Sequence, residues 1–600
     1  MTLLENLKNE LSYIAYRLSY LTSEETDGEE VEKFKFDVSF IDEVNSKFGD
    51  VATNIALTLA KKVGKTPKVI GEEIIKEINF NLNNNENNFS KIIKEVSLAP
   101  NGFINFSLKE EFLIKEVKRI SDLKFIETKF SDKKILIEHS SPNLFKPFHI
   151  GHLMNNIIGE AIVSMIKKSG SDMRIVSFPS DISVGIAKAI YILKNKKNWS
   201  FFNQNIINIL GDAYVEGVKF YEENPDKQDE IKLVARNLFE RNSETEDYQI
   251  FQKAKDININ YFKNILENLG SHFDYFIYES EAGIRGEEIV KENLNKPESQ
   301  EIFKIGENGA VFFDTKKLKN KESDETIKSI FINSEGHPTY EAKDLGLIDL
   351  KYGYFPFDYN IFITDIEQVP HFNIVLQVAK ELGGVYAEIA EKSNHIPHGR
   401  LNLKGERISS RLGNVLKVEE LLGMVNKKVE ERLGEKTKDL NEIQKNNLIK
   451  NISLSALKVV ILKSKPGLSI DFDLENSLNF EGNTGPYLLY TYARANSILE
   501  KVNNDFNEEV KSISINSLPL YKKLIESESI IKRGIEELSP QLVVKYLFEL
   551  AQAFNTFYGK EKIISEDKKE TNSNIILVKY FLKVFKSSLN TIGIEEVERM

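Results

Sequence analysis

The stretch Ser140–Leu153, SSPNLFKPFHIGHL, holds residues whose types and spacing suit the binding of a nucleotide. His149 and His152 are three positions apart, so both imidazoles project from one side of a helix that begins here. Imidazoles and the free N–H groups of a helix N-terminus donate hydrogen bonds to phosphate oxygens. Gly151 has no side chain that would keep an adenine ring at a distance. A metal-binding HxxH or two surface histidines are the alternatives to a nucleotide site.

A strand, a loop and a helix are predicted to position this histidine pair. Lys134–His139 (KILIEH) is an apolar run of strand length, and a segment with two prolines and an asparagine follows it. The pattern from Ile150 to Lys168 is amphipathic and closes at Gly170. This order is typical of a parallel α/β unit, in which phosphates bind at the carboxyl edge of the sheet.

Further strands alternate with helical segments after this unit, which indicates a parallel sheet. Ser200–Gly270 is helical and charged, and we interpret it as an insertion into the sheet domain. The predicted strands are Met173–Phe178, Phe276–Ser280, Ala310–Phe313 and Ile361–Thr364.

The two ends of the chain differ from this central region. Helical periodicity from Val51 to Val63 and an alternating segment at Gly102–Leu108 predict a small α+β module over residues 1–110. From Phe480 onward the patterns are helical, which predicts an all-α helical bundle over residues 475–600. The expected fold is therefore multidomain, with a Rossmann-like α/β catalytic domain over residues 120–450 and its helical insertion at about residues 200–270.

Composition limits the chemistry and the location of the chain. It has no cysteine among its 600 residues, which excludes disulfides, thiolate zinc sites and a cysteine nucleophile. The amino terminus has acidic residues and helical periodicity where a signal peptide would be basic and then apolar, and no apolar segment is long enough to cross a bilayer. We expect a cytoplasmic protein. A net charge of −11 argues against a general nucleic-acid coat protein but permits local basic surfaces.

Two other motifs could bind phosphate. Gly64-Lys65-Thr66 is like the end of a P-loop, but Leu59 stands where that motif needs glycine, so a helix C-cap is the preferred interpretation. Lys404–Asn414, KGERISSRLGN, places small hydroxyls between two arginines and suits a loop that wraps phosphate oxygens. A solvated basic turn is the alternative for this second segment.

These motifs together resemble the class I aminoacyl-tRNA synthetases, and specifically the arginyl-tRNA synthetases. SSPNLFKPFHIGHL resembles the first signature of that family, and RISSR (residues 407–411) resembles the second, which is usually KMSKS or KMSSR. The resemblance covers nearly the whole chain in the family's order. It extends to KFGDVATNIALTLAKK and GFINFSL in the amino-terminal tRNA-binding module, GHPTYEAKDLGL and DIEQVPHF in the core, FEGNTGPYLLYTYAR at the opening of the anticodon-binding domain, and the terminus IGIEEVERM.

The resemblance implies an arginine–tRNA ligase that attaches L-arginine to tRNA(Arg) through arginyl-adenylate and releases pyrophosphate and AMP. The implied partners are tRNA(Arg), L-arginine and ATP, with no membrane, and we expect a monomer. ATP is the substrate and no prosthetic group is implied. Mg²⁺ is expected with ATP on phosphate-charge grounds, and the sequence names no protein ligand for it.

The resemblance also implies the roles of particular residues. The guanidinium of arginine is best met by buried carboxylates, and Tyr340 and Asp344 are four apart at helical spacing. The implied arginine-binding residues are Glu138, Asn143, His149, Tyr340, Asp344 and Gln368. The implied ATP-binding residues are His149, Gly151, His152, Arg407, Ile408 and Ser409. The implied catalytic residues are His149, His152, Lys146, Arg407, Ser409, Ser410 and Arg411. The candidates for tRNA binding are Asn54, Tyr487, Tyr490, Tyr492 and Arg494.

Some of these residues could instead have a purely structural role. Tyr340 could pack in the core, Asp344 could be an N-cap or part of a surface ion pair, and some of the tyrosines after residue 486 must pack between helices.

The chain departs from the family's pattern in two places. Arg407 replaces the first lysine of the second signature and Ser410 stands at its second lysine. In arginyl-tRNA synthetases without that second lysine, a lysine just before the first signature is thought to compensate, and Lys146 stands there. Our hypothesis is that Lys146 assists the departure of pyrophosphate. The other departure is Phe178–Ala187, FPSDISVGIA, where many members have GDWGTQFG, with Asp181 and Gly185 in register.

Two rival functions remain open from the sequence. One is another class I synthetase or adenylyl transferase with a HIGH motif, against which the lack of zinc cysteines and the arginyl-type motifs at both termini argue. The other is a degenerate paralogue that binds tRNA or partners without catalysis, which RISSR and FPSDIS would support.

Overall fold

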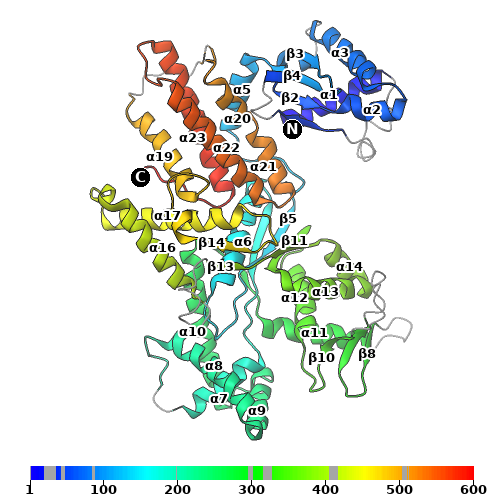
Figure 1. Ribbon diagram of the computed structural model, residues 1–600. Helices are drawn as coiled ribbons and strands as arrows, with labels where there is room; N and C mark the ends of the chain where they lie inside the picture. Colours follow the sequence, from blue (N-terminus) through cyan, green and yellow to red (C-terminus); the bar gives the residue numbers. More distant parts are fainter. Residues whose placement is uncertain are drawn as a thin grey trace. The chain divides into compact units, whose positions relative to one another are not determined.

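A computed structural model describes residues 2–18, 36–41, 47–83, 88–196, 199–294, 302–314, 328–403, 416–502, 510 and 512–600. The chain divides into two compact units (Figure 1). Unit 1 joins residues 1–129 to residues 480–600, and unit 2 is residues 130–479.

The amino-terminal part of unit 1 is a four-stranded antiparallel sheet, in the order β1-β2-β4-β3, with helices beside it. Its elements are α1 (Leu3–Arg17), β1 (Val38–Phe40), β2 (Val51–Thr53), α2 (Ile55–Val63), α3 (Pro67–Asn83), α4 (Asn88–Ile92), β3 (Ile93–Leu98), β4 (Ile104–Leu108) and α5 (Glu110–Ser121). The α+β prediction is confirmed, but the helix expected from Val51 begins only at Ile55, because Val51–Thr53 pair with two strands. Gly64 has a left-handed φ of 73° and caps α2, so the C-cap interpretation is confirmed.

The carboxy-terminal part of unit 1 is helical. Its elements are α19 (Gly485–Glu500), α20 (Leu518–Ile525), α21 (Ser527–Glu536), α22 (Pro540–Lys560) and α23 (Lys568–Thr591). The described residues from Phe480 onward contain no strand, which confirms the all-α prediction.

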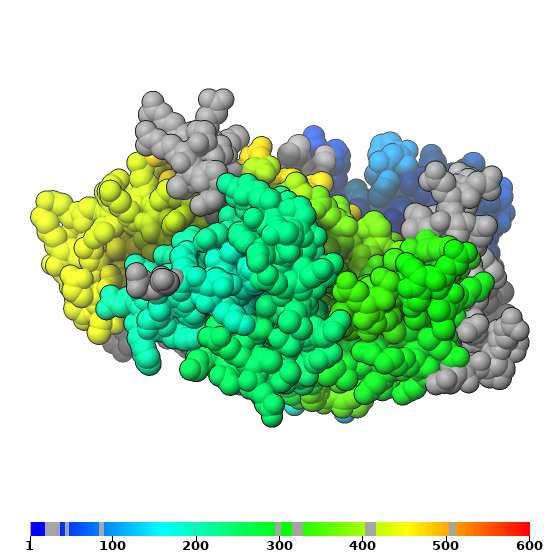
Figure 2. Space-filling view, turned by 90° about the horizontal axis from the view of Figure 1, so that it is seen from below, coloured from blue at the N-terminus to red at the C-terminus, as the bar shows by residue number. Residues whose placement is uncertain are grey.

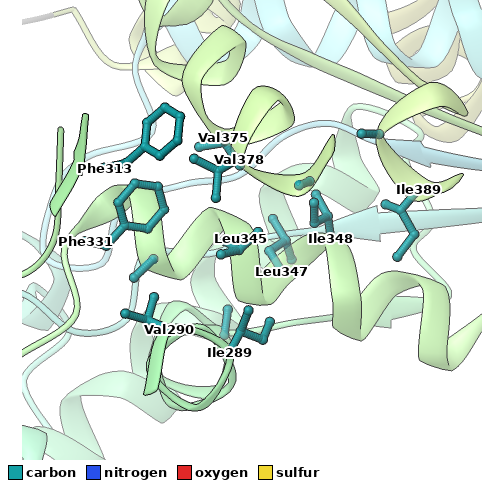
Figure 3. Packing of buried hydrophobic residues seen from close by; sticks show 14 of the residues in the cluster. Ile289, Val290, Phe313, Phe331, Leu345, Leu347, Ile348, Val375, Val378 and Ile389 are labelled. Atoms are coloured by element: carbon teal, nitrogen blue, oxygen red, sulfur yellow. The ribbon is translucent and has the colours of Figure 1, made fainter. Parts of the chain in front are cut away.

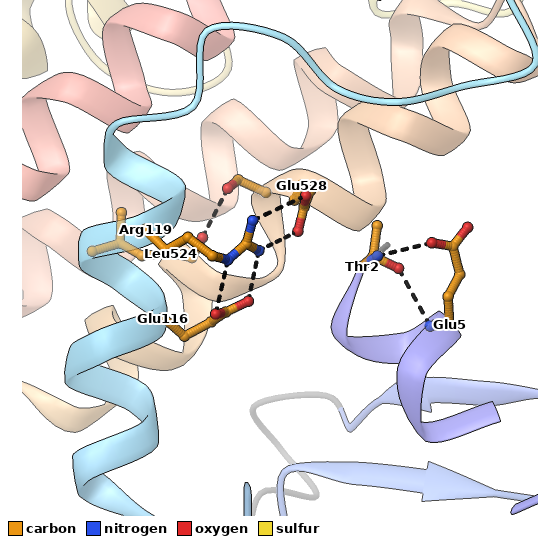
Figure 4. A network of polar contacts seen from close by, with 7 residues as sticks. Thr2, Glu5, Glu116, Arg119, Leu524 and Glu528 are labelled. Carbon is orange, nitrogen blue, oxygen red and sulfur yellow. Dashed lines mark hydrogen bonds and ion pairs between the residues drawn. The ribbon is translucent and has the colours of Figure 1, made fainter. Parts of the chain in front are cut away.

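An ion-pair network joins the two parts of unit 1 (Figure 4). The Arg119 guanidinium on α5 donates to Glu116 on its own helix and to Glu528 on α21, with Nη2 2.6 Å from Glu528 Oε2. Nearby, Thr2 and Glu5 form a capping box that starts α1. The Arg119 contacts explain why α5 groups with the carboxy-terminal helices. The division into three domains stays a prediction.

Unit 2 is built on a five-stranded parallel sheet in the order β12-β11-β5-β6-β7. Its strands are β5 (Lys134–Glu138), β6 (Asp172–Ser177), β7 (Tyr275–Phe276), β11 (Tyr359–Asp365) and β12 (Ser393–His398). Helix α6 follows β5 and runs over Ile150–Lys168, as predicted. Two strand predictions are corrected. The chain is already helical at Glu279 in α11 (Glu279–Leu294), and Ala310–Phe313 corresponds to β9 (Val311–Asp314) in a separate antiparallel sheet.

The remaining elements of unit 2 surround this sheet. They are α7 (Val184–Asn195), α8 (Ile206–Glu223), η4 (Pro225–Lys227), α9 (Gln228–Phe239), α10 (Glu246–Asn268), β8 (Phe303–Ile305), β10 (Lys328–Ile332), α12 (Tyr340–Tyr354), η7 (Ile366–Gln368), α13 (Val369–Leu382), α14 (Gly384–Glu391), β13 (Leu401–Leu403), α16 (Val418–Leu433), η8 (Gly434–Thr437), α17 (Glu442–Leu462), β14 (Ile470–Phe472) and α18 (Leu474–Ser477).

The helical insertion is confirmed, because α8, α9 and α10 lie between the neighbouring parallel strands β6 and β7. Figure 2 shows this insertion (teal to green) on one face of unit 2 beside the segment that holds α16 and α17 (yellow). Two side-chain hydrogen bonds join these parts, from Tyr261 Oη to Glu419 and from Lys417 Nζ to Asn208.

Helix α12 is held by an apolar core (Figure 3). Leu345, Leu347 and Ile348 of α12 pack with residues of α11, β9, β10, α13 and α14. The backbones of α11 and α12 also approach closely, because a Cβ at Gly346 would overlap the carbonyl of Ala282. The packing of α12 matters because its first two turns carry Tyr340 and Asp344.

Candidate active site

The histidine pair caps the N-terminus of α6. His149 Nδ1 accepts a hydrogen bond from the Gly151 N–H at 3.1 Å, and His152 Nδ1 accepts one from the His149 N–H at 3.2 Å. The two rings stack with centroids 3.9 Å apart. A Cβ at Gly151 would lie 2.9 Å from His149 Cε1, so glycine here also leaves room for the folded-back ring.

These contacts determine the chemistry of both imidazoles. A neutral imidazole whose Nδ1 accepts must carry its hydrogen on Nε2. Burial, with the charge of Lys146 added, lowers the pKa of His149. Burial and the neighbouring His149, Lys146 and His398 hold the pKa of His152 well below its usual range. Both rings are therefore neutral at pH 7 and carry an Nε2–H that can donate to phosphate oxygens.

The signature loop, residues Ser140–His149, is held in an unusual backbone conformation. Ser140 and Phe145 have φ angles of 55° and 63°, which are costly for residues with a side chain. The Ser140 N–H donates to Asn155 Oδ1 of α6 at 2.6 Å, and the Phe145 N–H donates to Asn258 Oδ1 of α10 at 3.2 Å. Thus both α6 and the helical insertion fix the loop.

The second signature, with Arg407, Ile408, Ser409, Ser410 and Arg411, lies outside the described residues. The chain that follows it lies next to the first signature. The Val418 N–H donates to the Phe148 carbonyl at 2.9 Å, and the Ile150 N–H donates to the Leu416 carbonyl at 3.3 Å. On the other side, β13 contacts α6. The sequence following the second signature is therefore bonded to the residues that flank His149.

Tyr340 and Asp344 lie on the first turns of α12, one turn apart, as their spacing predicts. Asp344 is neither a cap nor in a surface ion pair: its Oδ2 lies 2.6 Å from His371 Nε2 of α13, and 14% of its side chain is exposed. Although 63% of Tyr340 is exposed, its pKa is raised, first by desolvation and then by Glu279, Tyr214 and Asp344. Tyr340 is thus not a core residue, and the charges of Glu279 and Asp344 contribute to its raised pKa.

Lys146 of the signature loop contacts the helical insertion. Its Nζ lies 5.1 Å from the ring centroid of Tyr214 on α8, within the range of a cation–π contact. Tyr214 is also among the groups that raise the pKa of Tyr340. Lys146 of the signature loop and Tyr214 of the helical insertion are therefore in contact within unit 2.

The other predicted arginine-binding residues are arranged differently. Glu138 ends β5 and is 5% exposed, and its carboxylate forms an ion pair with the buried Lys351 of α12. Asn143 forms a backbone bridge with Ser180. Gln368 is exposed at the end of η7, just before α13. Hence the Glu138 carboxylate already has a partner within the protein, and its role toward arginine stays a prediction.

Two polar residues of the segment FPSDISVGIA, Ser180 and Asp181, form hydrogen bonds and an ion pair with other elements of unit 2. Asp181 is fully buried and accepts from Lys255 Nζ at 2.6 Å and from Ser280 Oγ at 2.7 Å. Ser180 Oγ donates to Glu279, which is also 3.4 Å from Lys343 Nζ. Ser180 and Asp181 of this variant segment are therefore both bonded to other residues of the protein.

The predicted tRNA-binding residues lie in unit 1. Asn54 is bonded to Asp37 by both its amide oxygen and its amide nitrogen. Tyr487 accepts from Asn555 at 3.0 Å, and Tyr492 is 8% exposed. Tyr490 is 36% exposed, and the Arg494 guanidinium lies 4.0 Å from the centroid of Tyr558. Of the three tyrosines on α19, Tyr490 is the most open to a ligand.

Reasoning from the sequence missed three residues of this site: His371, Tyr214 and Lys351. His371 lies within the quoted motif DIEQVPHF, so its polar side chain one turn after Gln368 was a usable signal. Tyr214 is distant in sequence from every motif, and only the fold of the insertion brings it to Lys146.

The family comparisons agree with this geometry. The family model for the catalytic domain of class I tRNA synthetases (R) matches residues 117–473. The arginyl tRNA synthetase N-terminal domain matches residues 3–108, and the DALR anticodon-binding domain matches residues 488–600. The parallel sheet, the histidine-capped helix and these matches define a class I aminoacyl-tRNA synthetase.

Individual relatives narrow this class. The chain is 29% identical to the arginine–tRNA ligase of Fusobacterium nucleatum over 93% of this chain and 94% of that protein. It is 30% identical to the arginine–tRNA ligase of Borrelia hermsii over 92% and 93%. Its fold is similar to a solved structure of Thermus thermophilus arginyl-tRNA synthetase, with a TM-score of 0.81 at 21% identity and 100% of both chains covered. The chain belongs to the arginyl-tRNA synthetase family.

Among the residues that the structure describes, no helix has the length and apolar character needed to cross a membrane. These residues also contain no group of three or more His, Asp or Glu side chains placed to hold a metal ion.

Proposed function

We propose that the signature loop and the first turns of α12 together carry out the arginine–tRNA ligase reaction of this chain. The reaction attaches L-arginine to tRNA(Arg) for protein synthesis, with ATP as substrate and arginyl-adenylate as intermediate. The observation that carries the proposal is the Asp344 carboxylate, which His371 holds by one oxygen, one helical turn from Tyr340.

Asp344 Oδ1 and the Tyr340 hydroxyl receive the guanidinium of arginine. A guanidinium is always charged and presents its donors in a plane, so a fixed carboxylate gives it both energy and orientation. A substrate without this group would leave Asp344 Oδ1 without a substrate partner, which costs roughly 10⁴–10⁵ in kcat/KM at sites of this type. Asn143, Gln368 and Glu138 complete the proposed arginine site.

ATP binds at the N-terminus of α6. The Nε2–H groups of His149 and His152, with the helix dipole, donate to its phosphates, and Gly151 leaves space for the adenine. The residues of the second signature, Arg407, Ile408, Ser409, Ser410 and Arg411, complete the phosphate contacts. The hydrogen bonds of Leu416 and Val418 with the first signature support this, because these two residues follow the second signature in the chain.

The chemistry follows from this placement. The α-carboxylate of arginine attacks the α-phosphorus of ATP in line, and pyrophosphate leaves. Lys146 assists that departure by neutralising charge on the phosphates. The terminal ribose hydroxyl of tRNA(Arg) then attacks the carbonyl carbon of arginyl-adenylate, and AMP leaves.

Mg²⁺ accompanies ATP in this proposal, bound by the phosphates. The phosphates supply the oxygen ligands that Mg²⁺ prefers.

The protein acts as a monomer in the cytoplasm, where aminoacyl-tRNA is used for translation. The monomer is supported by the fact that the residues proposed for arginine and ATP come from one unit of one chain. Light scattering of the purified protein tests the oligomeric state.

ATP–pyrophosphate exchange tests the function, with each amino acid in turn and with or without tRNA(Arg). We expect exchange that depends on arginine when tRNA(Arg) is present. Exchange supported by a different amino acid would contradict the arginine assignment. No exchange even with tRNA would indicate a paralogue without catalysis.

A further inference from the structure

Tyr214 of the helical insertion lies beside the lysine that precedes the first signature. The Lys146 ammonium is 5.1 Å from the centroid of the Tyr214 ring. Such a contact attracts the cation to the ring face, and it is stronger where water is partly excluded. Tyr214 is half-buried on α8, and Lys146 is half-buried in the signature loop.

The Tyr214 ring lies against Gly185 of α7. A Cβ at Gly185 of α7 would overlap the Tyr214 hydroxyl, so the glycine of FPSDISVGIA provides the space that the ring occupies. Tyr214 is also among the groups that raise the pKa of Tyr340, a residue proposed for arginine.

A lysine needs such a support more than an arginine does. Its stem has four rotatable bonds and its ammonium is a point charge, so an unsupported Lys146 would spend much of its time away from the phosphates. The ring face restricts these conformations before ATP binds. The lysine keeps its hydrogen-bond donors, because a ring face does not neutralise its charge as a carboxylate would.

We propose that Tyr214 is a positioning residue for Lys146, through which the helical insertion contributes to the formation of arginyl-adenylate. The ring face of Tyr214 holds the ammonium where it meets the phosphates of ATP, and the tyrosine hydroxyl is not required. The inference rests on the proposed function of Lys146. It also gives a reason for Gly185 and assigns the insertion a role within the active site.

The test is arginine-dependent ATP–pyrophosphate exchange of the full chain with tRNA(Arg) present. We expect Tyr214→Leu to lower kcat by about tenfold, with the KM for arginine changed by less than about twofold. Tyr214→Phe keeps the ring face, so we expect it to remain within about twofold of the wild type. The matched control is Tyr221→Leu, because Tyr221 is on the same helix and has Lys188 of α7 4.0 Å from its ring centroid. We expect that control to have the wild-type kcat.

A double-mutant comparison shows whether Tyr214 acts through Lys146. We expect Tyr214→Leu to have no further effect in a Lys146→Ala background. An undiminished effect in that background would overturn the proposal, as would a wild-type kcat for Tyr214→Leu or an equal loss for Tyr214→Phe. Failure of the proposed function is distinguishable, since the wild-type chain would then show no arginine-dependent exchange. Equal melting temperatures of the two leucine variants exclude unfolding as the cause of a lower kcat.

Discussion

His371 Nε2 lies 2.6 Å from Asp344 Oδ2, so an imidazole on α13 orients a carboxylate on α12. This contact occupies one carboxylate oxygen and leaves Oδ1 for a substrate. Burial lowers the pKa of His371, but the hydrogen bond and charge of Asp344, with Glu341, outweigh it and raise the pKa above its ordinary value. The protonated state of His371 therefore partly neutralises Asp344.

The first prediction is that arginine binding strengthens as the pH rises. Asp344 and Glu341 of α12 and His395 of β12 are the titratable neighbours of His371. Above the raised pKa, His371 loses its charge and no longer competes with the guanidinium for Asp344. We expect the KM for arginine to fall about three- to tenfold between about pH 6 and about pH 9, while the KM for ATP stays constant. In His371→Gln this pH dependence should disappear. If it persists there, His371 is not the titrating group.

The His371–Asp344 pair should stabilise the fold less as the pH rises, although arginine binding becomes stronger. A raised folded-state pKa stabilises the protein below the unfolded-state pKa of histidine, and this contribution is lost as the pH rises through the raised value. Denaturant unfolding of wild type and His371→Gln at several pH values measures it. The free energy of unfolding of the wild type should exceed that of His371→Gln at low pH, and this difference should shrink as the pH rises.

The second prediction concerns Asp344→Asn. Removing the charge that meets the guanidinium should raise the KM for arginine about a hundredfold and leave the KM for ATP within about twofold. Asp349→Asn is the matched control, because Asp349 lies on the same helix and binds Arg285 at 2.7 Å. Equal effects of Asp344→Asn on both KM values would contradict its assignment to arginine.

Local patterns predicted the elements around the histidine pair well. The strand, loop and helix over residues 134–168 follow from an apolar run, two prolines and a regular helical period, so tertiary contacts had little to override. The predicted elements were wrong where pairing between strands distant in sequence determined the structure. Val51–Thr53 has the apolar content of α2, yet it pairs with β1 and β4, and β9 joins an antiparallel sheet that no local pattern distinguishes from the parallel one.

The site residues that belong to a sequence motif could be predicted. Contacts between residues that are far apart in the sequence could not. His149, His152, Tyr340 and Asp344 follow from their spacing and the family resemblance. The ion pair of Glu138 with Lys351, and the contact of Lys146 with Tyr214, join residues more than 60 positions apart. No periodicity in either segment records such a contact, because each residue has an equally good local role as a surface or core side chain.

The third prediction is that Lys146→Ala slows adenylate formation. Loss of a cation beside the departing pyrophosphate should lower kcat for exchange by about ten- to a hundredfold, with the KM for arginine within about twofold. Lys188→Ala removes a comparable lysine from another cation–π contact and should leave exchange unchanged. An unchanged rate in Lys146→Ala would refute the hypothesis that this lysine compensates for the altered second signature.

The fourth prediction separates two neighbouring tyrosines of α19. Tyr490 is 36% exposed and Tyr492 is 8% exposed, so of these two residues Tyr490 offers the larger exposed area to an anticodon base. Tyr490→Ala should raise the KM for tRNA(Arg) in aminoacylation about tenfold, which corresponds to the loss of one stacked base, with little change in melting temperature. Tyr492→Ala should destabilise unit 1 by about 3 kcal/mol through a cavity among the helices. Aminoacylation kinetics and thermal unfolding of both variants decide between these roles, and a reversed pattern would show that Tyr492 contacts the tRNA.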